Sequence, residues 1–186
     1  MHYHYMLELR RKIAHLLLGV ALAFLVVSAP LEFVVVCNLL VLLGLLVCSL
    51  LHRRRPNWFL TWLFSRFDRK ERLTAKGAIT FFAGTLVAIL LFAPLYAALS
   101  ILVLSISDAL ATIAGYYAGR HRLIKNKTVE GSLVFCVCTF LILFLFVAPP
   151  KALLTAVIAS ATELATPAYL DDNITIPFVT GLLLSL

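Results

Sequence analysis

Charged residues are scarce in this chain. Only 13% of its 186 residues are Asp, Glu, Lys or Arg, 62% are hydrophobic, and the mean hydropathy is +1.02. A soluble domain would carry about a quarter charged residues, so this chain has too little polar surface to cover a globule in water. The composition predicts an integral membrane protein. It argues against a nucleic-acid-binding domain, although the net charge is +7.

The chain also lacks the two-residue alternation of a transmembrane barrel, and its Leu- and Ala-rich runs predict helices instead. Apolar runs occupy residues 13–29, 31–51, 78–92, 95–118, 133–147, 152–165 and 174–186. We therefore expect an all-α integral membrane protein, with residues 1–186 forming a single bundle of about seven transmembrane helices. The third and seventh runs are shorter than the ~20 residues of a usual span.

Cysteine is rare, and no pair has Cys-x-x-Cys spacing. All four cysteines lie inside apolar runs, which favours buried thiols over metal ligands or disulfides. They are Cys37, Cys48, Cys136 and Cys138.

Cations are unevenly placed along the chain. All of the sixteen except Lys151 lie at residues 10–12, 53–76 or 120–127, before the first run or after the second and fourth. The positive-inside rule then predicts a cytoplasmic amino terminus and places these loops on the cytoplasmic side.

Residues 52–76 form the longest polar segment. Its large apolar residues fall on one helical stripe, with arginines and a lysine at the end: Trp58, Phe59, Trp62, Leu63 and Phe67. This pattern predicts an interfacial amphipathic helix. It serves either as an anchor or as the rim of a path by which lipid reaches the site.

Polar residues also precede and begin the first apolar run. On a helix they share one side, at spacings of three and four: Glu8, Arg11, Lys12, His15 and Gly19. A positive-inside anchor explains the cations. His15 lies a turn inside the run, where a polar side chain is costly unless it faces a partner or a wet cavity. Both interpretations stay open.

Apart from Glu32 at the start of the second run, the acids within the apolar runs are Asp108 and Glu163, with Asp171 and Asp172 near a boundary. An unpaired carboxylate as deep as Asp108 would cost ~2.5 kcal/mol or more. Either His15 or Lys76 is its partner, or a magnesium ion is. We favour magnesium, which prefers oxygen ligands, held by Asp108, Asp172 and Glu163. The lone amide Asn38 is expected to make an interhelical hydrogen bond.

The loop after Asp108 carries cations, and Lys127-Thr128 looks like the end of a nucleotide-binding loop. Asn126 stands where that motif has glycine, and no strand precedes it, so the motif is absent. Cationic side chains and helix-start amides still suit phosphate. Gly115 and Gly119 suit either this loop or a helix-packing seam.

Two motifs resemble the CTP-dependent lipid alcohol kinases, which include dolichol kinase, phytol kinase and the CTP-using diacylglycerol kinase. They are Asp-Ala-x-Ala-x-x-x-Gly-x-x-x-Gly at residues 108–119 and Lys-Thr-x-Glu-Gly-Ser at residues 127–132. Arg11-Lys12-x-x-His15 and Glu163 with Asp172-Asn173 and Pro177 resemble the flanking motifs. Phosphatidate cytidylyltransferases are similar more distantly.

The resemblance implies transfer of the terminal phosphoryl group of CTP to a membrane lipid alcohol, with Mg²⁺, at the cytoplasmic face. The implied catalytic residues are Asp108, Lys127, Glu130 and His15, with Asp108 or His15 receiving the alcohol proton. Glu130 is also suited to ligate a metal ion or to stabilise the amino end of a helix. The implied nucleotide-binding residues are Arg11, Lys12, Lys76, Gly115, Gly119, Arg120, Arg122, Thr128, Gly131, Ser132 and Asn173.

Two other functions compete with the kinase. A cytidylyltransferase would join CMP to a lipid phosphate and release pyrophosphate. Acids and broken helices also suit a transporter. The particular lipid alcohol and the oligomeric state stay open, and a homo-oligomer is compatible with the sequence.

Overall fold

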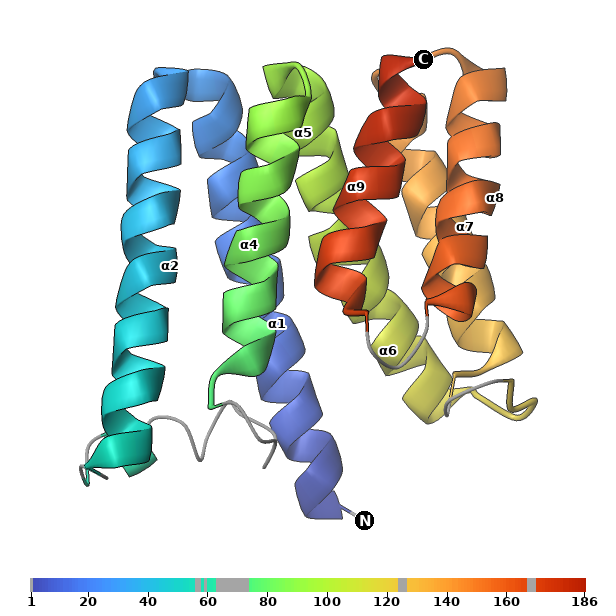
Figure 1. The fold of residues 1–186 in the computed structure, drawn as a ribbon. Helices are drawn as coiled ribbons and strands as arrows, with labels where there is room; N and C mark the ends of the chain where they lie inside the picture. Colours follow the sequence, from blue (N-terminus) through green and yellow to red (C-terminus); the bar gives the residue numbers. More distant parts are fainter. Residues whose placement is uncertain (1, 56–57, 59, 63–73, 124–126, 167–169) are drawn as a thin grey trace.

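The computed structural model describes residues 2–55, 58, 60–62, 74–123, 127–166 and 170–186. These residues fold into helices standing side by side, with the two termini at opposite ends (Figure 1). In chain order they are α1 (His2–Ser28), α2 (Leu31–Arg54), α4 (Lys76–Leu91), α5 (Pro94–Leu102), the π-helix η1 (Val103–Ser107), α6 (Asp108–Tyr117), α7 (Val129–Phe144), α8 (Pro149–Ala165) and α9 (Asp172–Ser185).

Within the described residues, three helices are long and apolar enough to cross a membrane. They are Leu7–Ser28, Leu31–Arg54 and the continuous α5–η1–α6 rod, Pro94–Tyr117. Helices α4 and α7 are apolar but shorter, at 16 residues each. The all-helical prediction is confirmed for the described residues. The count of seven spans stays a prediction.

Several helices extend beyond the apolar runs that predicted them. Helix α1 begins at His2, long before the run at residue 13, and Glu8 and Arg11 form an i,i+3 ion pair of 2.8 Å on this extension. Helix α2 continues through His52, Arg53 and Arg54, where basic residues complement the negative end of the helix dipole. The helix predicted for residues 31–51 therefore ends three residues later than predicted.

The α5–η1–α6 rod forms the centre of the bundle, with α1, α4, α7 and α9 against it (Figure 1). Its apolar residues pack with Phe81 of α4 and Phe135 of α7 in the main core. Helix α2 stands at the edge, where Asn38 Nδ2 donates to Thr85 Oγ1 of α4 at 3.0 Å. This bond confirms the interhelical role expected for Asn38.

The π-helix η1 interrupts the rod directly before Asp108. Helix α1 approaches it closely, because a Cβ on Gly19 would lie 1.7 Å from Ser105 Oγ. Ser107 accepts a hydrogen bond of 3.0 Å from Thr139 Oγ1 of α7. Short π-helical turns often occur at functional sites. Here the turn and the close contact with α1 set the position of Asp108 against the start of α1.

The predicted interfacial helix is described only in part. Trp58 and Trp62 are helical and exposed. Phe59, Leu63 and Phe67 lie outside the described residues, so the prediction is untested.

Candidate functional site

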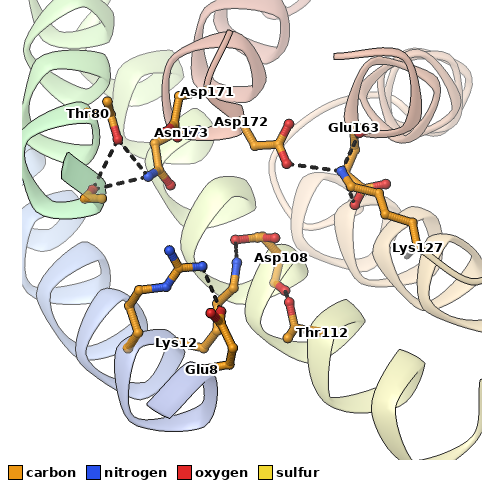
Figure 2. Close-up of polar contacts among 12 residues, drawn as sticks. Glu8, Lys12, Thr80, Asp108, Thr112, Lys127, Glu163, Asp171, Asp172 and Asn173 are labelled. Atoms are coloured by element: carbon orange, nitrogen blue, oxygen red, sulfur yellow. Dashed lines mark hydrogen bonds and ion pairs between the residues drawn. The ribbon is translucent and has the colours of Figure 1, made fainter. Parts of the chain in front are cut away.

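Ionisable side chains gather toward the end of the bundle where the amino terminus lies. There α1, α4, α7 and α9 begin and α8 ends, together with the loop that follows α6 (Figure 1). Figure 2 shows side chains from these elements pointing toward one another in two paired groups. We call them the Asp108 pair (Lys12 and Asp108) and the Lys127 cluster (Lys127, Glu163 and Asp172).

The Asp108 pair joins α1 to α6. Lys12 Nζ donates to Asp108 Oδ2, and the two residues are only 8% and 7% exposed. The expectation that Asp108 needs a partner is correct, but the suggested partners, His15 and Lys76, are wrong. Lys12 reaches Asp108 because the Gly19 contact holds α1 against the rod one to two turns further along.

His15 lies on the same face of α1 as Lys12 and is buried. Its ring packs on Phe81, with ring centroids 4.8 Å apart. The face predicted from Lys12, His15 and Gly19 therefore points into the bundle rather than serving only as a charged fringe. A role for His15 in proton transfer stays a prediction.

The Lys127 cluster joins the loop after α6 to α8 and α9. Lys127 Nζ lies 2.6 Å from Glu163 Oε1 and 3.0 Å from Asp172 Oδ2, and it also donates to the Glu163 backbone carbonyl (Figure 2). Burial alone would lower the pKa of Lys127, but Asp172 and then Glu163 outweigh it, so the pKa is raised above its usual value. Lys127 is therefore protonated, and its ammonium group connects the loop after α6 to α8 and α9.

One carboxylate oxygen of the Lys127 cluster has no partner. Glu163 is 6% exposed, and its Oε2 is buried without a hydrogen bond in the described part of the chain. Asp108 is close enough to interact electrostatically with both Glu163 and Lys127. The two groups therefore form one continuous polar region.

The backbone around Lys127 is fixed by a short antiparallel contact. Leu123 N donates to the Lys127 carbonyl at 2.7 Å, and Val129 N donates to the His121 carbonyl at 3.0 Å. Thr128 then caps α7, since its Oγ1 accepts from Gly131 N at 3.1 Å. The cap and the ladder hold Lys127 directly before the first turn of α7.

The glycines of the central motif let α6 and α7 approach each other. A Cβ on Gly119 would lie 2.1 Å from the Gly115 carbonyl oxygen and 2.6 Å from Thr128 Cγ2. A Cβ on Gly131 would lie 2.9 Å from the Ala111 carbonyl oxygen. The structure thus supports a helix-packing seam at these positions. A role in nucleotide binding is untested.

Other predicted residues lie outside the two groups. Glu130 bonds with His121, with 2.9 Å between Oε1 and Nδ1, rather than with either lysine. Arg120 and Arg122 are exposed. Ser132 is buried at the start of α7, and its carbonyl accepts from Ser160 Oγ at 3.1 Å.

The starts of α1, α4 and α9 are linked beside the Asp108 pair. Asn173 Nδ2 donates to the Gly77 carbonyl at 3.2 Å and to Thr80 Oγ1 at 3.1 Å (Figure 2). The Arg11 guanidinium lies over Gly77, where a Cβ would be 3.4 Å from Nη1. Lys76 begins α4 next to this contact. Asn173 therefore has a structural role that its motif alone did not reveal.

The predicted magnesium ligands are not gathered into a ready metal site. Among the described residues, no three His, Cys, Asp or Glu side chains are placed to hold a metal ion. The Glu163 and Asp172 carboxylates do converge on one cation, the Lys127 ammonium, and Glu163 keeps an unpartnered oxygen. Mg²⁺ usually takes one or two carboxylates, waters and substrate phosphates, so this pair fits Mg²⁺ when a phosphate completes the set.

Comparison of the sequence with known proteins finds an archaeal relative. No family model matches the chain, and no solved structure matches it. A protein of Methanocaldococcus jannaschii, named Uncharacterized protein MJ1137, is 27% identical over 183 residues, which cover 97% of this chain and 94% of that protein. The chain is thus similar to this archaeal protein over nearly its whole length.

Proposed function

We propose that this protein is a membrane-embedded kinase that transfers the terminal phosphoryl group of CTP to the hydroxyl of a long-chain lipid alcohol. The observation that carries the proposal is the pairing of two lysines with carboxylates, the buried Lys12 with Asp108 and the half-buried Lys127 with Glu163 and Asp172, at one end of an apolar bundle. The acceptor class is an isoprenoid or glycerolipid alcohol, such as a polyprenol, phytol or diacylglycerol.

Phosphoryl transfer needs positioning and charge neutralisation more than covalent chemistry. Lys127 and Lys12 supply ammonium groups for phosphate oxygens, and Asp172 and Glu163 supply oxygen ligands for Mg²⁺. The metal, when bound, neutralises charge on the phosphates. Arg11 and Lys76, at the starts of α1 and α4, lie near the same region and add cations.

The alcohol must lose a proton as its oxygen forms a bond to the terminal phosphorus. The bond from that phosphorus to the bridging oxygen of CTP breaks, and CDP leaves. Asp108 is the proposed proton acceptor, because it is a buried acid within the rod and Lys12 holds it in place. His15 is the second choice for this role.

The proposed site receives one substrate from the aqueous cytoplasm and the other from the lipid bilayer. CTP arrives from the cytoplasm, at the end of the bundle that carries nearly all the cations. The lipid arrives from the bilayer, with its hydroxyl at headgroup depth. The exposed Trp58 and Trp62 suit that depth. Seven spans with a cytoplasmic amino terminus complete the proposed topology.

Purified protein in lipid vesicles, given Mg²⁺, a panel of lipid alcohols and CTP labelled in its terminal phosphate, tests the proposal. Label should enter a lipid in the wild type and in Arg10→Met, and should not in Asp108→Asn or Lys127→Met. Arg10 is the matched control, an exposed cation beside the site. Near-normal turnover in Asp108→Asn, or no labelled lipid with any alcohol, would refute the kinase.

The same assay separates the competing functions. A cytidylyltransferase given a lipid phosphate would release the label as pyrophosphate. A transporter would show neither labelled product nor a CTP-dependent shift in thermal stability.

A further inference from the structure

The Lys127 cluster has an uneven charge balance. One ammonium faces two carboxylates, so the cluster keeps an excess negative charge. Glu163 is buried and its Oε2 has no hydrogen bond among the described residues. Uncompensated charge in such surroundings is costly, which makes the cluster a strong site for a cation of higher charge than an ammonium.

The cluster is also reachable from solvent. The side chains of Lys127 and Asp172 are 22% and 32% exposed, while that of Glu163 is 8% exposed. Asp172 therefore stands at the mouth and Glu163 at the floor, with the Lys127 ammonium between their oxygens. A divalent cation that used both carboxylates would need the place that this ammonium takes.

The backbone hydrogen bonds of Lys127 do not depend on its side chain. Its carbonyl accepts from Leu123 N, and Thr128 caps α7. The flexible four-carbon stem of lysine can thus move its ammonium without breaking the loop. Asp108 lies within electrostatic range of both Lys127 and Glu163, so a displaced ammonium stays near negative charge.

We infer that Lys127 and a divalent cation compete for Glu163 and Asp172, so that the cation binds tightly only when a polyphosphate draws the Lys127 ammonium away. A divalent ion between the two carboxylates balances their charge, and the released ammonium balances part of the charge of the phosphates. The inference rests on the proposed function only for the identity of that polyphosphate. It makes metal and nucleotide bind together rather than separately.

Binding of Mn²⁺ to the full-length protein in detergent, measured by electron paramagnetic resonance without nucleotide, tests the competition. Lys127→Met should bind Mn²⁺ at least about tenfold more tightly than the wild type, which corresponds to only about 1.4 kcal/mol. Lys127→Arg should not, because it keeps a cation in place. Adding Glu163→Gln to Lys127→Met should remove the gain.

Two outcomes overturn the inference: Lys127→Met binds Mn²⁺ no more tightly than the wild type, or the gain survives Glu163→Gln. Arg10→Met measures the effect of removing one positive charge nearby, and a gain of equal size there would also overturn it. These measurements use no lipid and no turnover. A protein that shows the competition but labels no lipid would retain this inference and lose the kinase.

The wild type provides a second measurement in case Lys127→Met does not fold. Mass spectrometry after amine labelling should show Lys127 becoming more reactive as Mn²⁺ alone is raised high enough to displace its ammonium from the carboxylates, with Lys151, near the start of α8, as the internal reference. Unchanged Lys127 labelling would overturn the competition.

Discussion

The Asp108 pair gives the sharpest prediction about stability. The side chains of Lys12 and Asp108 are 11% and 10% exposed, and they join helices far apart in sequence. Removing one member of a buried ion pair costs ~3–5 kcal/mol, because the other charge is left unpaired. We expect Lys12→Met to destabilise the protein by about this amount, with protonation of Asp108 limiting the loss.

A double-mutant cycle isolates the pair. Lys12→Met with Asp108→Asn should cost less than the sum of the two single changes, by ~1–3 kcal/mol, because neither charge is then unpaired. Unfolding of the full-length protein in mixed micelles, followed by far-ultraviolet circular dichroism, measures each variant. Arg10→Met removes an exposed cation from the same helix and should change stability by about 0.5 kcal/mol or less. Additive effects of Lys12→Met and Asp108→Asn would show that the pair is not coupled.

Three further predictions concern the loop and the glycine seam. Gly119→Ala should lower Tm, because the added Cβ would lie 2.1 Å from the Gly115 carbonyl oxygen. The control Gly44→Ala, whose Cβ would have no atom within 4 Å, should leave Tm unchanged or raise it. Equal shifts in Tm for the two variants would contradict the packing argument. Thr128→Ala should cost ~1 kcal/mol in chemical unfolding through loss of the α7 cap, and an unchanged midpoint would argue against the cap. The pKa of Lys127 is raised in the folded protein, so the protonated side chain stabilises the fold fully below its usual pKa of 10.5, and this stabilisation is lost as pH rises through the pKa of the folded state. The difference in Tm between the wild type and Lys127→Met should therefore be constant near neutral pH and shrink at strongly alkaline pH.

Apolar run length predicted the helices well because burial in lipid or core demands an unbroken apolar face. It predicted their ends less well, since polar residues extend a helix when they find partners. Glu8 and Arg11 do so on α1, and the cations through Arg54 do so on α2. Such partners depend on tertiary placement or the helix dipole, which hydropathy does not record.

The partner of Asp108 illustrates the limit of spacing. The sequence left open whether the face that carries Lys12, His15 and Gly19 is an anchor or lines a site, and it offered His15, Lys76 or a magnesium ion as the partner of Asp108. The choice of Lys12 depends on the register between α1 and the rod. That register is set by the Gly19 contact with Ser105 inside a π-helical turn, and Val103–Ser107 shows no sequence signal for such a turn.

The contacts of Gly115 and Gly119 in the structure support one of the two roles that the sequence left open. Gly115 and Gly119 suited either phosphate binding or helix packing in the sequence. In the structure a Cβ on Gly119 would lie 2.1 Å from the Gly115 carbonyl oxygen and 2.6 Å from Thr128 Cγ2, and a Cβ on Gly115 would make a tight contact of 3.0 Å with Thr128 Oγ1. Close packing of α6 on α7 at these glycines holds the start of α7 and, with it, Lys127 near Glu163 and Asp172, while their role in nucleotide binding stays a prediction.

Lys12 and Lys127, two of the lysines implied as phosphate ligands, are already bonded to carboxylates, which constrains how the proposed substrates bind. A nucleotide alone that took Lys127 would leave Glu163 and Asp172 uncompensated, and a metal alone would have to displace an ammonium held at 2.6 and 3.0 Å. With both bound, the divalent ion balances the two carboxylates and the Lys127 ammonium balances part of the charge of the phosphates. Linkage then requires that CTP strengthen Mn²⁺ binding by the same factor as Mn²⁺ strengthens CTP binding. Titrations of each ligand with and without the other should show that each increases the affinity for the other, by equal factors, in the wild type. In Lys127→Met these factors should fall toward one. Independent binding of the two ligands in the wild type would show that the paired charges do not couple them.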